Sequence, residues 1–324
     1  MTSCILGLDS GGSKTLLAIA DRQGRVLRLE RCGGLDPIAN PQWKAQLNAL
    51  LRSVAHVPLS AAVLGLPLYG ELAECSLAQQ TLSEQALPCP VKVENDVQAA
   101  FDGAFLGELA GVLILAGTGS MAWACGLEKS DEPVRVGGWG DVFGDEGSAY
   151  WIGAQALIVA SRTLDGRANE PWLTRALLGH LQLLPAQLAG WVYQLNNRRE
   201  GVAALARQVS AWADAGDGAA LTIIRDAAEH LADHVSTAWT AIGRQGPPAW
   251  SHAGGVFANP SITEQLCHRL GAAPCRPRLP PIGGALWRAA HNAGWNPDNL
   301  WLEHLSLSLH STLALPSTSP FPTM

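Results

Sequence analysis

The sequence predicts two α/β domains of the same design within one chain. A strand, a glycine-rich turn and a second strand open the chain within residues 4–20, and the same pattern returns within residues 111–125. Matching Gly12 to Gly119 aligns the two hairpins as an internal repeat. The length of 324 residues suits two domains, and the apolar content of 48% is enough for a sizeable core. Glycine turns between strands are common, so a chance repeat of two hairpins is the alternative.

The first half is expected to contain strands that alternate with helices. Apolar runs bounded by turn residues predict the strands, which lie at 4–8, 16–20, 26–29, 61–66 and 91–93. Helical spacing begins at Pro41, covers residues 71–85 and begins again at Val97. This order is typical of an α/β domain, which we place at residues 1–108.

The second half is expected to be mostly helical after its first strands. The predicted strands lie at 111–116, 121–125, 134–136 and 250–253. Helical periodicity covers 147–160, 171–180, 185–195, 202–213, 219–242, 261–270 and 283–293. We place the second domain at residues 109–300, with a last helix that is free to pack back on the first domain. The segment 301–324 is expected to be a tail, poorly ordered from Ser306.

Composition excludes several classes of protein. The net charge is −6 and charged residues make up only 15%, which argues against a nucleic-acid partner. No apolar run is long enough to span a membrane, and the first residues lack the features of a signal peptide. The seven cysteines are scattered, without zinc-binding spacing. We therefore expect a cytoplasmic protein without a membrane partner, and a homodimer is the assembly that general frequencies favour.

The two glycine-rich turns are candidates for phosphate binding. The first nearly spells a Walker A loop, but one residue too many precedes Lys14 and a strand follows instead of a helix. The remaining interpretation is a hairpin tip whose backbone N–H groups face phosphate oxygens. Asp9 at the end of the first strand would repel phosphate unless it holds Mg²⁺. The alternative is that Asp9 only caps a tight turn.

Three segments resemble the N-acetylglucosamine kinases of the BadF/BadG/BcrA/BcrD ATPase family, in the sugar kinase–Hsp70–actin superfamily. They read LDSGGSKT at 8–15, AGTGS at 116–120 and GGWGDVFGDEGSAYWIG at 137–153. Their order and spacing match over about residues 4–293. The resemblance implies a duplicated RNase H-like, actin-like ATPase fold with two domains around a nucleotide cleft. It also implies ATP and Mg²⁺ as cofactors.

The resemblance assigns the nucleotide site residue by residue. The positions implied for the ATP phosphates are Asp9, Ser10, Gly11, Gly12, Ser13, Lys14, Thr118 and Gly119. Asp9 would be oriented to Mg²⁺, through water. The positions implied for adenosine are Ala213, Gly254 and Gly255.

Asp96 matches the catalytic aspartate of the family. An aspartate at the end of a strand can accept the proton of a sugar hydroxyl during phosphoryl transfer. The alternative is a helix cap before Val97, and one residue can serve both roles. The positions implied for the sugar are Asn40, Asp96, Gly138, Trp139, Gly140 and Asp145. Which residue of the loop Asp36–Asn40 contacts sugar stays open.

The expected reaction is transfer of a phosphoryl group from ATP to the 6-hydroxyl of N-acetylglucosamine. Val136 would accommodate the acetamido methyl, whereas Asp141 would favour the ammonium of glucosamine, and N-acetylmuramic acid also stays open. A second alternative is an ATPase activator of a CoA-ester dehydratase or reductase, with an iron–sulfur cluster between subunits. A sugar-sensing repressor is disfavoured, because no helix-turn-helix precedes residue 7 and the charge is acidic.

Overall fold

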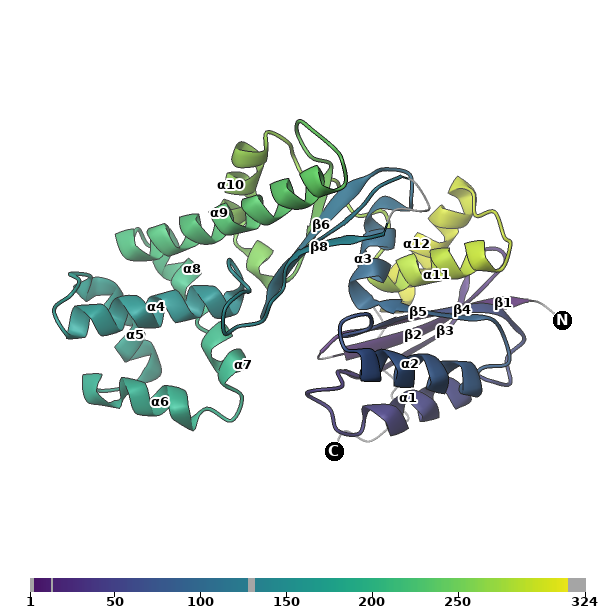
Figure 1. Ribbon diagram of the computed structural model, residues 1–324, viewed down its shortest axis with the longest axis horizontal. Coiled ribbons are helices and arrows are strands. Elements are labelled where there is room, and N and C mark those ends of the chain that lie inside the picture. The colour runs from purple at the N-terminus through teal and green to yellow at the C-terminus, as the bar shows by residue number, and fades with distance from the viewer. Residues whose placement is uncertain (1–2, 13, 128–131, 314–324) are drawn as a thin grey trace. The chain divides into compact units, whose positions relative to one another are not determined.

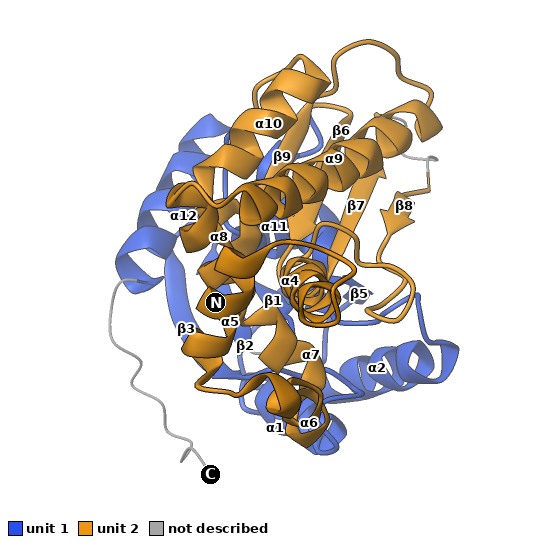
Figure 2. Ribbon diagram, turned by 90° about the vertical axis from the view of Figure 1, so that its left-hand side faces the viewer, with its two compact units in different colours: residues 1–108, 276–324 blue, residues 109–275 orange. Residues whose placement is uncertain are grey.

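The computed structural model describes residues 3–12, 14–127 and 132–313, and the chain divides into two compact units (Figure 2). Unit 1 consists of residues 1–108 and 276–324, and unit 2 consists of residues 109–275. The sequence-based boundary at residue 300 therefore differs from this division. Residues 276–300 group with unit 1 because their helix packs on the first sheet.

The sheet of unit 1 has the strand order β3-β2-β1-β4-β5. The hairpin β1–β2 and the pair β2–β3 are antiparallel, whereas β4 runs parallel to both β1 and β5. Parallel neighbours require crossover connections, which the helices between β3, β4 and β5 supply. The strand bounds are β1 Cys4–Ser10, β2 Lys14–Asp21, β3 Val26–Gly33, β4 Leu59–Leu66 and β5 Val91–Asn95.

Helices cover both faces of this sheet (Figure 1). Side chains along β1 alternate between two apolar cores, because successive residues of a strand point to opposite faces. Leu6 and Leu8 enter the core beneath α1 and α2, whereas Ile5 enters the core shared with α11 and α12. A Cβ at Gly7 would lie 2.9 Å from Leu286 Cγ, so α11 packs directly on β1. The helix bounds are α1 Trp43–Arg52, α2 Ala73–Ala86, α3 Asp96–Phe105, α11 Pro281–Asn292 and α12 Asn299–Leu313.

The C-terminal segment corrects the prediction of a tail. Residues up to Leu313 form α12, and this helix buries one apolar stripe against unit 1. The buried side chains are Trp301, Leu302, Leu305 and Leu309. Their spacing places them on one face of a helix, and burial of that face stabilises the helix despite its many serines. The remainder of the expected tail, 314–324, lies outside the described residues.

The sheet of unit 2 repeats the design of the first. Its strand order is β8-β7-β6-β9, with β6–β7 and β7–β8 antiparallel and β6–β9 parallel. This order matches β3-β2-β1-β4 of unit 1, so the duplication predicted from the two hairpins is confirmed. The strand bounds are β6 Gly111–Ala116, β7 Ser120–Cys125, β8 Val134–Gly137 and β9 Trp250–Ala253.

The helices of unit 2 pack around α9, which carries much of the unit's apolar core. The segment 202–213, predicted as one helix, is divided between α7 and α8. In the segment 185–195 a 3₁₀ turn at Pro185–Gln187 precedes α6. The helix bounds are α4 Ala149–Leu164, α5 Pro171–Leu181, α6 Leu188–Gln194, α7 Arg198–Ala203, α8 Ala206–Asp214, α9 Gly218–Ala241 and α10 Pro260–Leu270. A 3₁₀ turn, η2 Gly255–Ala258, follows β9. Within the described ranges, none of the helices combines the length and apolarity needed to cross a bilayer.

Candidate functional site

The first glycine turn closes the β1–β2 hairpin of unit 1. Gly11 N–H donates to the carbonyl of Lys14 at 3.0 Å, which makes the turn tight. The Ser10 hydroxyl is buried, where it bonds Thr15 Oγ1 at 2.7 Å and accepts from Leu35 N–H at 3.2 Å. The predicted phosphate contact of Ser10 therefore cannot come from its hydroxyl in this conformation. Ser13 lies outside the described residues.

Asp96 stands at the first position of α3, directly after β5. Asn95 caps the helix, because its side chain accepts from Val97 N–H at 3.1 Å. One carboxylate oxygen of Asp96 accepts from the same N–H at 3.0 Å. The other, Oδ2, would lie 3.8 Å from a Cβ at Gly11. The structure thus brings Asp96 to the hairpin tip, and it also gives Asp96 the capping contact that the alternative foresaw.

Asp9 and Asp96 lie at the same end of the sheet, where the negative charge of Asp9 acts on the Asp96 carboxyl group. Burial raises the pKa of Asp96 to about 7, and the negative charges of Asp9 and Glu71 act in the same direction. Burial also raises the pKa of Asp9 to about 6, although the ammonium group of Lys14 opposes this rise. Two carboxyl groups that share a poorly solvated site resist simultaneous ionisation. A cation or a proton near this pair would be stabilised.

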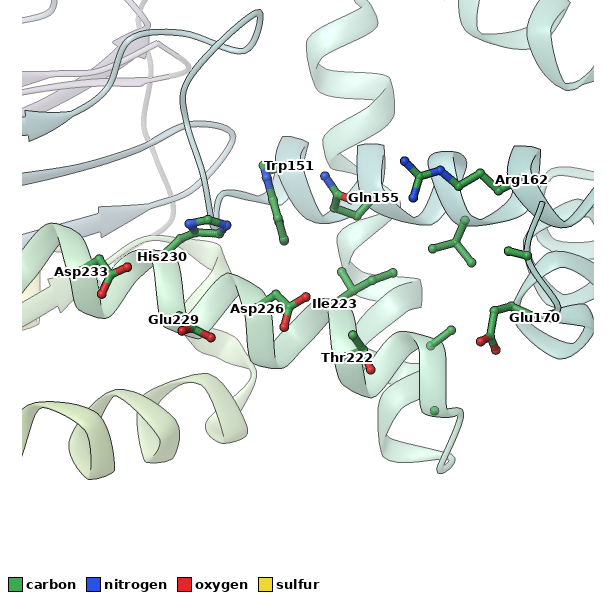
Figure 3. Close-up of a pocket in the computed structure, with 14 residues that line it drawn as sticks. Trp151, Gln155, Arg162, Glu170, Thr222, Ile223, Asp226, Glu229, His230 and Asp233 are labelled. Atoms are coloured by element: carbon green, nitrogen blue, oxygen red, sulfur yellow. The ribbon is translucent and has the colours of Figure 1, made fainter.

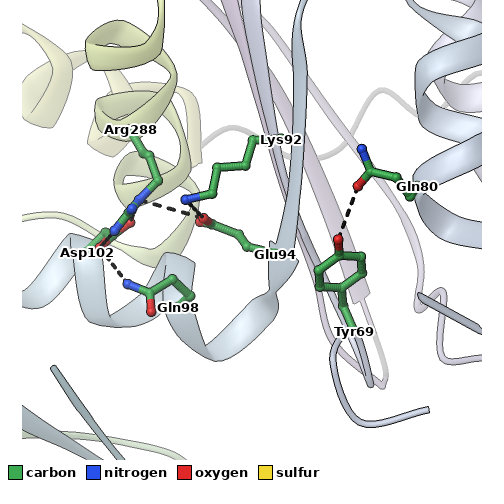
Figure 4. Close-up of polar contacts among 7 residues, drawn as sticks. All are labelled: Tyr69, Gln80, Lys92, Glu94, Gln98, Asp102 and Arg288. Carbon is green, nitrogen blue, oxygen red and sulfur yellow. Dashed lines mark hydrogen bonds and ion pairs between the residues drawn. The ribbon is translucent and has the colours of Figure 1, made fainter. Parts of the chain in front are cut away.

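A partly buried ionic network joins β5, α3 and α11 (Figure 4). Arg288 of α11 pairs with Asp102 of α3 and lies 3.6 Å from Glu94 Oε2. Lys92 lies 3.3 Å from the same oxygen, and Gln98 donates to Asp102 at 2.9 Å. Burial, with the charge of Asp102, raises the pKa of Glu94 to about 7. The network links α11 to the β5–α3 junction that carries Asp96.

A second contact in Figure 4 joins Tyr69 to Gln80 across 3.1 Å. It lies on the connection that leads from β4 into α2. The carbonyl of Tyr69 also accepts from the Asn95 side-chain amide at 2.9 Å. Asn95 is therefore held from both sides, which fixes the start of α3.

In the loop from Asp36 to Asn40, the structure favours the first residue as the one nearer the site. Asp36 Oδ2 would lie 3.9 Å from a Cβ at Gly12. The Asn40 amide instead donates to Gly34 O at 2.8 Å and to Gln46 Oε1 at 2.9 Å, so it is used within the loop. In this conformation, the Asn40 amide would have to leave these acceptors before it could donate to a sugar, as the resemblance implies.

The second glycine turn, Gly117–Gly119, joins β6 to β7 in unit 2. Its carbonyls accept from the first N–H groups of α4, with Ala149 N to Gly117 O at 2.8 Å. A Cβ at Gly254 would lie 2.2 Å from Ala116 O, and Gly254 has a φ of 112°. Only a glycine allows β9 to approach β6 so closely there. The structure therefore brings the predicted phosphate turn and the predicted adenosine motif together within unit 2.

Asp145 lies against the same turn and forms an ion pair that the sequence did not predict. Arg199 Nη2 donates to Asp145 Oδ2 at 2.6 Å, and Arg199 Nε lies 3.8 Å from Asp141 Oδ1. The Asp145 side chain is only 3% exposed, whereas that of Arg199 is 45% exposed. Asp145 also adopts a left-handed φ of 57°, which is uncommon for a residue with a side chain. Neighbouring contacts must hold it there.

Trp139 lies in an exposed loop between β8 and α4. Gly138 and Gly140 on either side have φ values of 73° and 89°, so the chain turns sharply at both. The indole is 64% exposed, and the guanidinium carbon of Arg135 lies 5.1 Å from its ring centroid. Trp139 is therefore not part of the apolar core of unit 2.

The side chain of Ala213, a position that the resemblance implies for adenosine, is buried in the apolar core of unit 2. Its neighbours Asp214, Ala215 and Gly216 are exposed. Backbone atoms of that turn are the groups that remain accessible to a ligand.

The structure also contains a cavity of about 640 Å³ between α4 and α9 (Figure 3). Much of its lining is acidic, with Asp226, Glu229 and Asp233 along α9. Trp151 meets His230 edge-on, with ring centroids 5.1 Å apart. Among the described residues that line it, none is a predicted site residue. It is therefore separate from the glycine turns.

Comparison with known proteins complements this geometry. The family model of the BadF/BadG/BcrA/BcrD ATPase family matches residues 6–286. The chain is 28% identical over 267 residues to the N-acetylmuramic acid/N-acetylglucosamine kinase of Clostridium acetobutylicum, covering 79% of this chain and 86% of that protein. It is 26% identical over 256 residues to the N-acetyl-D-glucosamine kinase of Dictyostelium discoideum, covering 74% and 80%.

A solved structure shares the fold. A candidate N-acetylglucosamine kinase from Chromobacterium violaceum superposes with a TM-score of 0.69 at 24% identity, covering 87% of this chain and 97% of that one. With the strand order common to both sheets, this likeness confirms the predicted duplicated RNase H-like fold class.

Proposed function

The chain belongs to the BadF/BadG/BcrA/BcrD ATPase family, and from this membership we propose that it is an ATP-dependent amino-sugar kinase. The observation that carries the proposal is the placement of Asp96. Its carboxylate lies beside the first glycine turn and has a pKa raised to about 7. A base whose pKa lies near neutral pH both accepts and releases a proton readily. The curated relatives, both of which are named kinases of N-acetylated sugars, support the same activity.

In the proposed mechanism, Asp96 accepts the proton of the attacking sugar hydroxyl. The new bond forms between that oxygen and the γ-phosphorus, and the bond to the β–γ bridging oxygen breaks, so that ADP leaves. Phosphoryl transfer needs positioning and charge stabilisation more than covalent chemistry from the protein. The N–H groups of a glycine turn would provide part of that stabilisation.

Magnesium fits the residues at this site. The Asp9 carboxylate has a pKa raised by burial and lies within the field of Asp96, so a nearby divalent cation would favour its ionised form. Carboxylate oxygens are the ligands that Mg²⁺ prefers, and Mg²⁺ usually keeps several waters. Asp9 would hold the ion through water, and the ion would neutralise charge on the phosphates.

N-acetylglucosamine, phosphorylated at its 6-hydroxyl, is the substrate that we propose. A free ammonium at the 2-position would require an unpaired carboxylate. Asp145 and Asp141 both lie near the Arg199 guanidinium, which already offsets their charge. This supports an acetamido group over an ammonium.

A coupled ADP-release assay tests the proposal. N-acetylglucosamine, glucosamine, N-acetylmuramic acid and glucose are compared by kcat/KM, and phosphorus NMR locates the phosphate on the product. We expect the highest kcat/KM for N-acetylglucosamine and a 6-phosphate product. A preference for glucosamine that disappears in Asp141→Asn would instead identify a glucosamine kinase. Absence of ADP release with every sugar, together with bound iron after anaerobic purification, would favour the dehydratase or reductase activator.

A further inference from the structure

The ion pair between Arg199 and Asp145 is the strongest feature that the proposed mechanism leaves unexplained. Arg199 is on α7, a short helix that begins after the cap Asn197. A Cβ at Gly153 would lie 2.0 Å from Val202 O, so a glycine in α4 lets the backbone of α7 pack directly against it. The position of α7, and with it that of Arg199, is therefore fixed by close backbone packing.

The guanidinium of Arg199 lies directly on the second glycine turn. A Cβ at Gly119 would be 2.5 Å from Arg199 Nη2 and 2.7 Å from Asp145 Oδ2. The turn and the guanidinium thus occupy adjacent positions with no side chain between them. Any anion bound by the N–H groups of this turn would be within reach of the arginine.

The arginine has donors left for such an anion. Arg199 Nη2 donates to Asp145, whereas Nη1 donates to no acceptor within the described ranges. The Arg199 side chain is 45% exposed. The Thr118 and Gly119 N–H groups likewise donate to no acceptor in the part of the chain that the structure describes. Asp145, in contrast, is buried beneath the guanidinium. The exposed charged group beside this turn is therefore the Arg199 guanidinium.

We propose that Arg199 binds the γ-phosphate of ATP at the Gly117–Gly119 turn and stabilises the phosphoryl group during its transfer. The inference rests on the proposed function, since that function assigns phosphate to the turn. A guanidinium presents several N–H donors in a planar fork that matches phosphate oxygens. Asp145 and Asp141 hold this fork in one orientation, so little reorganisation is needed when charge develops. Arg199 keeps its protons throughout; only the sugar hydroxyl proton moves, to Asp96.

Nucleotide binding tests the proposal independently of turnover. The affinities of ADP and of the non-hydrolysable analogue AMPPNP, both with Mg²⁺, are measured by calorimetry for wild type, Arg199→Met and Arg198→Met. Arg198 is the matched control, since it is the adjacent arginine and its guanidinium carbon lies 5.9 Å from the Tyr193 ring. We expect Arg199→Met to bind AMPPNP about tenfold more weakly, the loss of one charge-assisted contact, with ADP affinity changed less than about twofold. Equal weakening of both nucleotides, or of neither, would overturn the proposal.

Turnover supplies the second readout. We expect kcat to fall on the order of 10²–10³-fold in Arg199→Ala, with Arg198→Ala close to wild type. Low concentrations of guanidinium ion should restore part of the activity of Arg199→Ala, because the free ion can occupy the vacated position. A role limited to neutralising Asp145 predicts a lower melting temperature without such rescue, and that result contradicts the proposal.

Misfolding of Arg199→Ala and failure of the proposed function can both be distinguished from failure of the Arg199 proposal. If Arg199→Ala fails to fold, Arg199→Lys keeps a positive charge for Asp145 but loses the planar fork, and it should still lose AMPPNP affinity selectively. If the wild type transfers phosphate to none of the sugars, the proposed function fails, whereas the comparison of ADP with AMPPNP still decides the role of Arg199.

Discussion

The two hairpins share a backbone design but carry opposite charges. In unit 1, Asp9 stands one residue before the final β1–β2 pair, Ser10 with Thr15. In unit 2, the same register position is Leu115, before the pair Ala116 with Ser120. The charged group nearest the second turn is instead the exposed Arg199. Both halves of the duplication thus have a glycine-rich turn between antiparallel strands, and the residues around the two turns differ in charge.

The two sheets also differ in the strands that follow the parallel pair β1–β4 of unit 1 and the parallel pair β6–β9 of unit 2. Unit 1 has β5, and the junction of β5 with α3 presents Asp96. Over the described residues of unit 2, the sheet ends at β9 and holds no counterpart of β5. The candidate base and the candidate magnesium carboxylate thus belong to unit 1, whereas unit 2 supplies glycines and a cation. The two halves of the duplication therefore carry different chemical groups beside similar turns.

The largest expected effect comes from removing the candidate base of unit 1. Asp96→Asn keeps the shape of the carboxylate and the capping contact to Val97 but cannot accept a proton. We expect turnover to fall on the order of 10²–10⁴-fold, with ATP affinity little changed. Steady-state kinetics and nucleotide calorimetry measure both quantities. A variant with near-normal turnover would reduce Asp96 to a helix cap.

The pH dependence of kcat/KM should depend on unit 1. Because the pKa of Asp96 is raised to about 7, the protonated form predominates below that pH and cannot act as a base. We expect kcat/KM to fall about tenfold for each pH unit below that value. In Asp9→Asn one neighbouring negative charge is lost, so the pKa of Asp96 decreases and the acidic limb shifts to lower pH. A limb that stays in place would show that Asp9 and Asp96 do not interact.

Alanine in each turn compares the two hairpins directly. A methyl at Gly119 would overlap Arg199 and Asp145, whereas at Gly12 the nearest atom, Asp36 Oδ2, would be 3.9 Å away. We expect Gly119→Ala to lower the free energy of unfolding by about 1–3 kcal/mol and Gly12→Ala to change it by less than about 0.5 kcal/mol. Urea denaturation gives both values. Equal costs would mean that the ion pair does not lie on the second turn.

The smallest expected effect concerns Glu94, which belongs to the ionic network of β5, α3 and α11. The pKa of Glu94 is raised to about 7 from 4.5, so its ionisation in the folded state opposes folding increasingly as the pH rises between those values. Glu94→Gln should therefore raise the free energy of unfolding by about 1 kcal/mol at about pH 8 and have little effect at about pH 4. Denaturation at the two pH values checks this. A variant that is less stable at the higher pH would mean that the pairs with Lys92 and Arg288 outweigh burial.

The fold was largely predictable because its signals are local. Alternating apolar residues and glycine turns mark the hairpins, and the repeat of these signals predicts the duplication. The α12 helix was not predicted because the uncharged run of Ser, Thr, Leu and Pro from Ser306 suggested a tail, although Trp301, Leu305 and Leu309 follow helical spacing. That stripe was the available signal. Helices of this kind are stabilised by the surface they cover, which the local sequence does not reveal.

The site was predictable only where the sequence block itself carries the chemistry. Asp145 lies in such a block and Asp96 directly follows a predicted strand, and the structure places each beside a glycine turn. Arg199 could not be found this way, because it meets Gly119 only through the packing of α7 on α4. Ala213 shows the opposite case, since a position that matches the family in sequence has its side chain in the apolar core.

The discontinuity of unit 1 has a consequence for the order of events on the ribosome. The apolar core on the Ile5 face of β1 includes residues of α11 and α12, which are synthesised last. Unit 2, in contrast, is one continuous segment of the chain. Unit 2 can therefore complete its core while the apolar face around Ile5 and Val63 is still uncovered. A nascent chain that stalls after residue 275 would hold a finished unit 2 next to an open sheet, a state prone to aggregation and to capture by chaperones.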